Sequence, residues 1–270
     1  MKKISASDKQ GIIASLVKTF KYRFLVYTFA ARDLKAQYAQ TVLGIMWSII
    51  RPLTGLLIYT VFFRYLLNVD TGSVPYPLFA FSGMICWYYF SYLISSAGTS
   101  LLEAQDIIKK IYFPKLILPV SKVLVGLVEF GISLILLFVM LIIWGFTPDL
   151  KILLFPFLIA LNIITAFSIG IWLSALTVRF RDFHHIIPYL VNFGIFLTPV
   201  FYPATLIPSK YYFFIYLNPM AGVIEGFRWV LFGGAVPSVY FLVGFIPVIL
   251  LFISGLYYFT RIEGRMTDII

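Results

Sequence analysis

The stretch RDLKAQYAQTVLGIMWSIIRP, from Arg32 to Pro52, decides the architecture of this chain. Its first part is basic and amphipathic, and its second part is apolar enough to enter a membrane. We expect the basic part to lie at the membrane surface and to turn, without a loop, into a spanning helix, with the bend at Gly44. Trp47 and Arg51 then share one helix face at the level of the lipid headgroups, where this spacing allows a cation–π contact between them.

The composition favours a protein embedded in lipid. Hydrophobic residues make up 61% of the 270-residue chain, aromatic residues 19% and charged residues 12%. A soluble domain of this size cannot bury so much apolar surface. The net charge of +10 is explained by anionic lipid headgroups, and no nucleic-acid partner is predicted.

Six apolar stretches are long enough to span a bilayer, which takes roughly 20 residues. They cover about residues 45–67, 78–100, 118–144, 152–178, 186–203 and 239–259. Pro188 and Pro199 interrupt the fifth stretch, so we place it inside the bundle, where neighbouring protein satisfies the carbonyls that proline frees. The predicted fold is an all-α polytopic membrane protein with six transmembrane helices.

Lysine and arginine are concentrated in alternate connections, and this pattern sets the orientation. The segment before the first span is rich in both and the second connection is rich in lysine, whereas residues 68–77 have neither and the third connection has only Lys151. Both termini are therefore predicted to be cytoplasmic. We divide the chain into an amphipathic interface segment, 1–44, and a transmembrane domain, 45–270.

The N-terminal segment 9–35 is predicted to be a helix lying in the cytoplasmic interface, because its apolar residues recur at helical spacing. These residues are Ile12, Ile13, Leu16, Val17 and Phe20. The helix is either an anchor that fixes the topology or a lever that moves with a cytoplasmic partner.

A polar and aromatic stripe follows one face of the second span, where Tyr88, Tyr92, Ser95 and Thr99 lie at intervals of four, three and four. With Trp47 they are candidates for the wall of a conduit on which sugar rings slide; the alternative is contact between helices. Arg51 either extends to the lipid interface, which we favour, or faces the bundle and meets an anionic headgroup. Glu129, inside the third span, is expected to be neutral or hydrogen-bonded between helices.

The second connection is predicted to contain a short cytoplasmic helix from Glu103 to Lys110, in which Asp106 can pair with Lys110. It is either a solvated turn or a docking knob for another protein. His184 and His185 in the fourth connection are adjacent and point apart, and no carboxylate or cysteine cluster joins them, so no metal site is predicted.

The segment 204–236 is too polar and too broken by proline for one span. We expect two short re-entrant half-helices in the outer leaflet, joined near Asn218 and Pro219, in which Glu225 and Arg228 can pair across one turn. The segment is either a cap over the bundle or a gate.

The chain contains no G-x-x-x-x-G-K-[ST] loop and none of the G-x-G-x-x-G, H-E-x-x-H or G-x-S-x-G motifs. It is therefore predicted not to be an enzyme and to bind no cofactor of its own. A transporter of this kind takes its energy from another subunit, or is passive.

Three stretches together carry a family resemblance: RDLKAQYAQTVLGIMWSIIRPL, RFRDFHHIIPYLVNFGIFLTPVFYP and LNPMAGVIEGFRWVLFGG. In order and spacing they resemble the permease subunit of ABC-2-type polysaccharide exporters, the O-antigen, teichoic-acid and capsule export family. The resemblance implies a homodimer in the bacterial cytoplasmic (inner) membrane, paired with two copies of a separate ATPase that binds ATP and Mg²⁺. It also implies export of a lipid-linked polysaccharide through a conduit between the two subunits.

The resemblance assigns roles to particular residues. Contacts with the ATPase are implied at Glu103, Ala104, Gln105, Asp106, Ile107, Lys109, Lys110, Arg179, Arg181 and Asp182, and at the N-terminal helix. The outer gate is implied to include Tyr202, Asn218, Glu225 and Arg228. The lipid-pyrophosphate head of the substrate is expected to meet Arg32, Lys35 and Arg51, because these basic residues lie near the membrane surface.

Two other functions compete with this one. An ABC-2-type exporter of a small lipophilic compound shares the six-span plan. A membrane-embedded lipid-linked sugar transferase needs clustered acids near the membrane surface, and the cytoplasmic acids Asp33, Glu103, Asp106 and Asp182 each stand beside basic residues instead.

Overall fold

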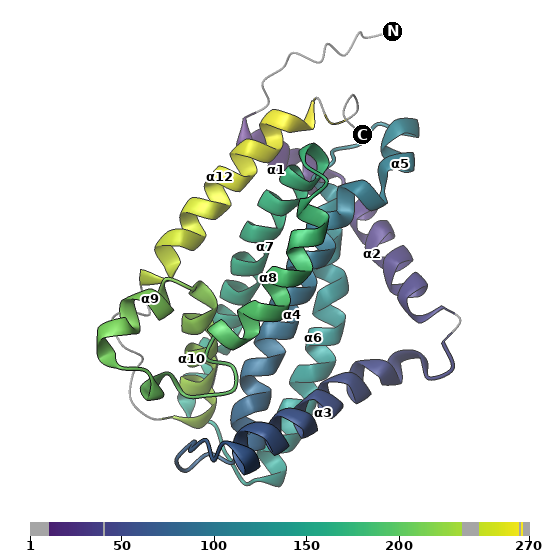
Figure 1. Ribbon diagram of the computed structural model, residues 1–270. Helices are drawn as coiled ribbons and strands as arrows, with labels where there is room; N and C mark the ends of the chain where they lie inside the picture. Colours follow the sequence, from purple (N-terminus) through teal and green to yellow (C-terminus); the bar gives the residue numbers. More distant parts are fainter. Residues whose placement is uncertain (1–10, 40, 234–242, 265, 267–270) are drawn as a thin grey trace, which may run out of the picture.

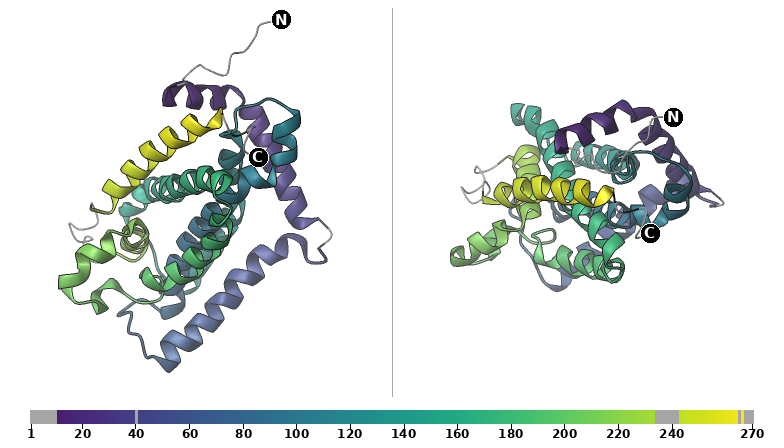
Figure 2. Two further views of the ribbon diagram at one scale, coloured as in Figure 1. Left: turned by 45° about the horizontal axis from the view of Figure 1, so that its top comes forward. Right: turned by 90° about the horizontal axis from the view of Figure 1, so that it is seen from above.

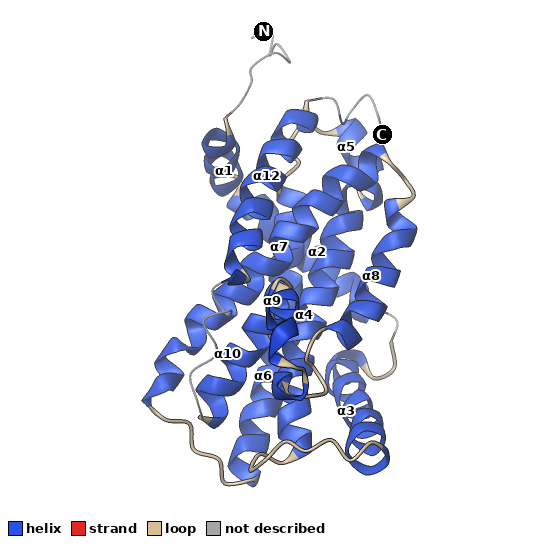
Figure 3. Ribbon diagram, turned by 60° about the vertical axis from the view of Figure 1, so that its left-hand side comes forward, coloured by secondary structure: helices blue, strands red, loops and turns tan. Residues whose placement is uncertain are grey.

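The chain folds into a bundle of helices around one central, buried helix. The computed structural model describes residues 11–39, 41–233, 243–264 and 266, and within these ranges it contains helices and no strand (Figure 3). The central helix is α4 (Tyr76–Glu103), which packs against α6 (Ile117–Ile143) and α7 (Phe155–Arg179). Figure 1 shows these three helices side by side. The predicted all-α fold is confirmed.

Small residues let the helices of this core approach closely. A Cβ added at Gly170 of α7 would lie 3.1 Å from the Cβ of Ala97 on α4, and one added at Gly98 would lie 3.3 Å from the Cβ of Leu173. Close backbone approach through small residues is the usual way in which membrane helices gain packing energy, because lipid supplies no hydrophobic drive between them.

Five described helical segments are long and apolar enough to cross a membrane: Gly44–Leu66, Tyr76–Glu103, Ile117–Ile143, Leu150–Arg179 and Phe245–Glu263. The first four match predicted spans within a few residues. The last contains α12 (Phe245–Glu263), whereas the predicted span starts at residue 239, outside the described residues. These segments expose large apolar side chains such as Leu57, Ile135 and Phe157, as expected of surfaces that face lipid or another subunit.

The predicted fifth span is shorter than expected. Its helix, α8 (Phe183–Leu197), has 15 residues and ends before Pro199 instead of continuing to residue 203. At about 1.5 Å per residue it reaches roughly 22 Å, less than a typical hydrocarbon core of about 30 Å. The count of six spans therefore stays a prediction.

The N-terminal segment forms two helices where one was expected. α1 (Ile12–Lys21) is followed by Tyr22, whose ψ of 23° breaks the helix. The next helix, α2 (Arg23–Tyr38), packs against α6 (Figure 2). α1 buries Ser15 and Thr19 and exposes apolar residues; Ile13 is 78% exposed. This inverted pattern supports the expectation that α1 lies on an apolar surface such as the membrane interface.

The expectation of a loop-free turn into the first span is wrong. α2 ends at Tyr38, and a non-helical connection precedes η1 (Gly44–Met46) and α3 (Trp47–Tyr59). Gly44 does mark the bend, because its φ of +50° lies in the left-handed region that glycine adopts without strain. Figure 2 shows α3 strongly inclined to the central helices.

The end of the first span packs, through aromatic rings, against the segment that follows α8. α3 continues into a π-helical stretch, η2 (Thr60–Leu66), and Tyr59 and Phe63 stack on the buried Phe201 with ring centroids 3.9 and 5.0 Å away. Tyr76 at the start of α4 donates a hydrogen bond to the Phe201 carbonyl, 3.0 Å away. The chain after α8 is thereby fixed against both α3 and α4.

Candidate functional site

The charged end of the bundle gathers the residues that were predicted to contact an ATPase. α5 (Gln105–Lys110) follows α4 after a break at Ala104, so Glu103 ends α4 and does not begin the short helix as predicted. In α5, Ile108 is buried, while Asp106, Lys109 and Lys110 are exposed. The expected Asp106–Lys110 pair does not form among the described ion pairs, so both charges are available to a partner.

The turn between α7 and α8 lies at the same end of the molecule as α5 and the end of α12 (Figure 1). Arg179, Arg181 and Asp182 are all exposed there. The structure therefore brings together the two segments to which the coupling role was assigned. Lys18 of α1 donates a hydrogen bond to the Tyr112 hydroxyl, 3.2 Å away, which joins the N-terminal helix to the chain just after α5.

One lysine connects three helices at this end. Lys122 of α6 is 3.0 Å from Asp33 Oδ2 of α2 and 3.1 Å from Glu103 Oε2 of α4. Thr99 donates to the other Glu103 oxygen, 2.6 Å away. A push on α5 would therefore reach α2 and α6 through charged contacts as well as through the backbone.

The predicted headgroup residues separate into two places. Arg32 is ion-paired with Asp33 at 2.7 Å and lies over the Phe29 ring, 4.9 Å from its centroid, while Lys35 is exposed on α2. Arg51 lies on α3, where it lines a cavity and is 5.7 Å from the Trp47 ring centroid. The cation–π contact that the spacing of Trp47 and Arg51 allows is present.

The cavity lies between α3, α4 and α6 and has a volume of about 230 Å³. Its lining combines five aromatic side chains, one carboxylate and one guanidinium: Trp47, Ser48, Arg51, Pro52, Ile85, Tyr88, Tyr89, Tyr92, Gly126, Glu129, Phe130 and Ser133. Only part of the polar and aromatic stripe predicted on this span, now α4, lines the cavity. Tyr88 and Tyr92 reach the cavity, whereas Ser95 and Thr99 lie outside its lining, toward the charged end.

Glu129 is hydrogen-bonded between helices, as predicted. Its Oε1 accepts from Gln37 Nε2 at 2.6 Å, from the Tyr38 hydroxyl at 3.3 Å and from Ser48 Oγ at 3.5 Å. Burial raises the pKa of the Tyr38 phenol above its ordinary value, and the Glu129 carboxylate raises it further, so Tyr38 remains a donor at neutral pH. One carboxylate on α6 thus holds the two ends of the connection between α2 and α3.

The outer segment is broken at Asn218, as predicted, but its helices are unequal: α9 (Tyr212–Tyr216) has five residues and α10 (Pro219–Phe232) has 14. The short turns η4 (Ala204–Leu206) and η5 (Ser209–Tyr211) precede them. Asn218 caps α10 by accepting from the Met220 amide at 3.1 Å, and its Nδ2 donates to Thr198 Oγ1 at 2.8 Å. Residues 234–236 lie outside the described residues.

The predicted pairing of Glu225 with Arg228 is wrong. Glu225 accepts a hydrogen bond from the Tyr216 hydroxyl of α9. Arg228 is 8% exposed and donates to the carbonyls of Pro199, Val200 and Phe79, at 2.7, 2.6 and 3.3 Å. It also lies 3.5 Å from the Phe79 ring centroid.

Arg228 therefore satisfies the carbonyls of Pro199 and Val200, in the segment that follows α8. Tyr202, the remaining predicted gate residue, donates to the Phe196 carbonyl at 3.1 Å, which folds the same stretch back on the end of α8. Both residues hold the outer segment to the bundle.

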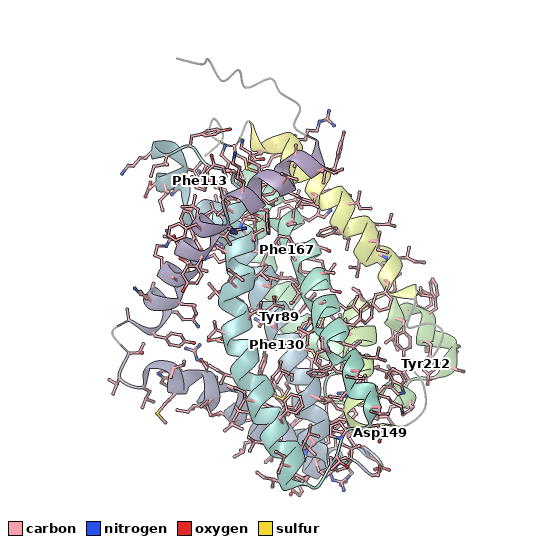
Figure 4. The ribbon with its side chains drawn as sticks, turned by 180° about the vertical axis from the view of Figure 1, so that it is seen from behind. Tyr89, Phe113, Phe130, Asp149, Phe167 and Tyr212 are labelled. Carbon is pink, nitrogen blue, oxygen red and sulfur yellow. The ribbon has the colours of Figure 1, made fainter. Side chains whose placement is uncertain are left out.

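Sequence reasoning missed several residues. Tyr89 lines the cavity beside Phe130, with ring centroids 5.0 Å apart (Figure 4). Lys115 binds the end of α12 through its Nζ, 2.8 Å from the Glu263 carbonyl. On α8, Tyr189, Phe193 and Phe196 form an exposed aromatic row. The spacing of four and three in this row is visible in the sequence and could have been read as a helix face.

A helical bundle in which five described segments are long and apolar enough to cross a membrane defines the class of α-helical membrane proteins. The chain belongs to the ABC-2 type transporter family, which matches residues 25–232. No group of three or more metal-ligating side chains occurs among the residues the structure describes.

Curated relatives extend the comparison over most of the chain. It is similar to the O-antigen export system permease protein RfbA of Myxococcus xanthus, 28% identical over 81% of this chain and 84% of that protein. A protein of the same name from Klebsiella pneumoniae is 28% identical over 91% of this chain and 95% of its own length. The polysialic acid transport protein KpsM of Escherichia coli is 25% identical over 88% and 93%.

Proposed function

We propose that this chain is the membrane subunit of an ATP-driven exporter that moves a lipid-linked polysaccharide across the bacterial cytoplasmic membrane. The observation that carries the proposal is the similarity to polysaccharide-export permeases along nearly their whole length. The separate ATPase subunit binds ATP and Mg²⁺, and this chain carries out no chemistry of its own.

The charged end is the surface on which the ATPase acts. Charges of α5 and of the turn between α7 and α8 are exposed at the same end of the bundle, and α5 is joined through Glu103 and Lys122 to α2 and α6. Closure of the ATPase on ATP pushes α5 and shifts the helices to which it is connected. Positive side chains of this end face the cytoplasm, as does the N-terminal interface segment.

Two copies of the chain form the conduit. Apolar and aromatic side chains on α3, η2 and α8 remain exposed in the single chain, among them Leu57, Phe62, Tyr189 and Phe193. A second copy covers part of this surface, and aromatic rings along the path bind sugars by stacking. Many weak contacts suit a moving polymer, because one tight site would hold it in place. The segment from Ala204 to Phe232 gates the outer side.

The proposal is tested by purifying the tagged chain from its native membranes. We expect an ATPase subunit to copurify, and we expect the complex in liposomes to hydrolyse ATP faster when a lipid-linked glycan is supplied. Purification without any ATPase would refute the proposal.

An exporter of small lipophilic compounds is the second candidate, and stimulation by such compounds but not by a glycan would favour it. Sugar-transferase activity of the chain without an ATPase would favour a membrane-embedded enzyme.

A further inference from the structure

A basic pocket lies along α5 and the chain that follows it. It has a volume of about 300 Å³, and its lining runs from Ile108 to Lys115 and includes Lys109 and Lys110. Among the described residues, no acidic side chain belongs to this lining. Glu263 contacts one edge: its carboxylate accepts from the Lys115 amide at 2.8 Å, and its carbonyl lies 2.8 Å from Lys115 Nζ. The pocket therefore carries a positive charge that Glu263 offsets only in part.

Two of these cations have no counter-ion in the protein. Neither Lys109 nor Lys110 forms an ion pair within the part of the chain that the structure describes, and the neighbouring Glu103 is already bound to Lys122. Asp106 precedes both lysines on α5 but lies outside the lining of the pocket. Adjacent cations repel each other, and an anion placed between them replaces that repulsion by attraction. The charges therefore favour an anionic occupant.

The edge of the pocket is apolar as well as basic. Ile111 and Tyr112 belong to its lining and are 62% and 70% exposed. Beneath them, Ile108 and Phe113 are buried in the apolar cluster that contains Phe29 of α2, and they close the pocket. A free phosphate would contact the lysines alone. A phospholipid would place its phosphate on the lysines and its glycerol and first acyl carbons against the exposed apolar side chains.

The N-terminal helix sets the depth of the pocket in the membrane. Lys18 of α1 donates to the Tyr112 hydroxyl at 3.2 Å, and its Nζ lies 5.3 Å from the centroid of that ring. The same helix exposes apolar side chains such as Ile13 and Phe20, as a helix lying in the membrane interface does. Figure 1 shows α1 and α5 at one end of the bundle. A pocket joined to α1 through Tyr112 lies at the level of the headgroups, where tyrosine and lysine are common anchors.

We infer that the basic pocket binds the phosphate headgroup of an anionic membrane lipid, in the leaflet at the charged end of the bundle. Lys109 and Lys110 contact the phosphate, and Lys18 adds a third positive charge from α1. Basic pockets between membrane helices are a known kind of site for such headgroups. Because Asp106 lies outside the lining, α5 can hold a lipid through its lysines and still present Asp106 to the ATPase. The inference adds a lipid site to the proposed coupling helix and does not depend on which substrate is exported.

Native mass spectrometry of the purified, detergent-solubilised chain measures the binding. The probes are phosphatidylglycerol, which is anionic, and phosphatidylcholine with the same acyl chains, which is zwitterionic. We expect the first phosphatidylglycerol to bind at least fivefold more tightly than the first phosphatidylcholine, and the double variant Lys109→Gln/Lys110→Gln to lose this preference. The control is Arg64→Gln/Lys210→Gln, which removes the same charge from exposed cations outside the pocket and should keep the preference.

Thermal unfolding separates lipid binding from folding. Both lysines of the pocket variant are exposed, so without lipid it should unfold at the same temperature as the unchanged chain. Added phosphatidylglycerol should raise the midpoint of the unchanged chain and of the control more than that of the pocket variant.

Equal binding of phosphatidylglycerol by the two double variants, or no preference for the anionic lipid, would overturn the inference. Displacement of the lipid by an equal concentration of inorganic phosphate would also overturn it and assign the pocket to a free anion. Normal lipid binding by Lys109→Gln/Lys110→Gln, together with loss of the copurifying ATPase, would assign the two lysines to the ATPase surface instead.

Discussion

Arg228 shows how one buried cation can fix the position of a segment in which prolines prevent a continuous helix. Its guanidinium binds three backbone carbonyls and the Phe79 ring, and Gly83 leaves space for it: a Cβ at Gly83 would lie 2.9 Å from Arg228 Nη2. Carbonyls freed near proline must be satisfied in an apolar environment. The cation is therefore part of the packing of the outer segment.

Replacing Arg228 by methionine should destabilise the fold by about 3 kcal/mol, because the carbonyls lose a charged donor. The measurement is the thermal unfolding midpoint in detergent. Lys210→Met, at an exposed cation of the same outer segment, is the matched control and should change the midpoint little. An equal effect of the two variants would contradict the role given to Arg228.

Gly44 supports a second prediction at this scale. Gly44→Ala should cost about 1–2 kcal/mol, because a side chain disfavours the left-handed conformation that this residue adopts. Gly131→Ala is the control, since Gly131 lies within α6 with nothing near its Cβ position, and there alanine should stabilise the helix. Both variants are compared by thermal unfolding. A neutral Gly44→Ala would mean that the bend does not need this conformation.

At the scale of elements, α5 is distinguished by its exposure. A short helix with a buried Ile108 and exposed charges is held to the bundle on one face and free on the other. Its Ile108 belongs to the apolar cluster that contains Phe29 of α2, and its backbone continues from the end of α4, where Glu103 meets Lys122. Such an element can transmit a push without unfolding.

Replacing Asp106 by lysine should uncouple ATP hydrolysis from export in the complex, because it reverses a charge that we propose faces the ATPase. The expected result is export reduced at least fivefold with ATP hydrolysis retained, measured together in liposomes. Asp149→Arg reverses an exposed charge between α6 and α7, at the opposite end of the molecule from Phe113 (Figure 4), and should leave both rates unchanged. Normal export by Asp106→Lys would remove α5 from the coupling path.

At the scale of the whole molecule, the directions of the helices place the connections at the two ends of the bundle and the apolar surface between them. α4 and α7 both end at the end that carries α5, and α6 begins there, so α5 and the turn from α6 to α7 lie on opposite sides of the bundle (Figure 1). Large apolar side chains are exposed between these ends. This division is what a membrane requires of a protein that crosses it.

Labelling from one side tests the proposed orientation. In spheroplasts, a membrane-impermeant maleimide should modify Asp149→Cys and spare Lys109→Cys until the cells are lysed. Cys86 is buried and should give little background. Labelling of Lys109→Cys in intact spheroplasts would reverse the orientation and refute the cytoplasmic position of α5.

The sequence by itself determined the all-α fold, five of the membrane-length helices, the break at Asn218 and the hydrogen-bonded state expected of Glu129. These features follow from local quantities: runs of apolar residues, prolines, and the free energy of burying a carboxylate. The order and spacing of the three family motifs along the chain can also be read from the sequence alone.

Only the tertiary structure decided which groups meet. Arg228 binds carbonyls and not Glu225, Glu103 binds Lys122, and Tyr89 joins Arg51 and Glu129 around one cavity. Partners far apart in the chain are chosen by helix packing, and a one-residue change in where α4 or α8 ends changes which side chains face each other. Spacing along the sequence carries no information about that choice, because it describes one helix at a time.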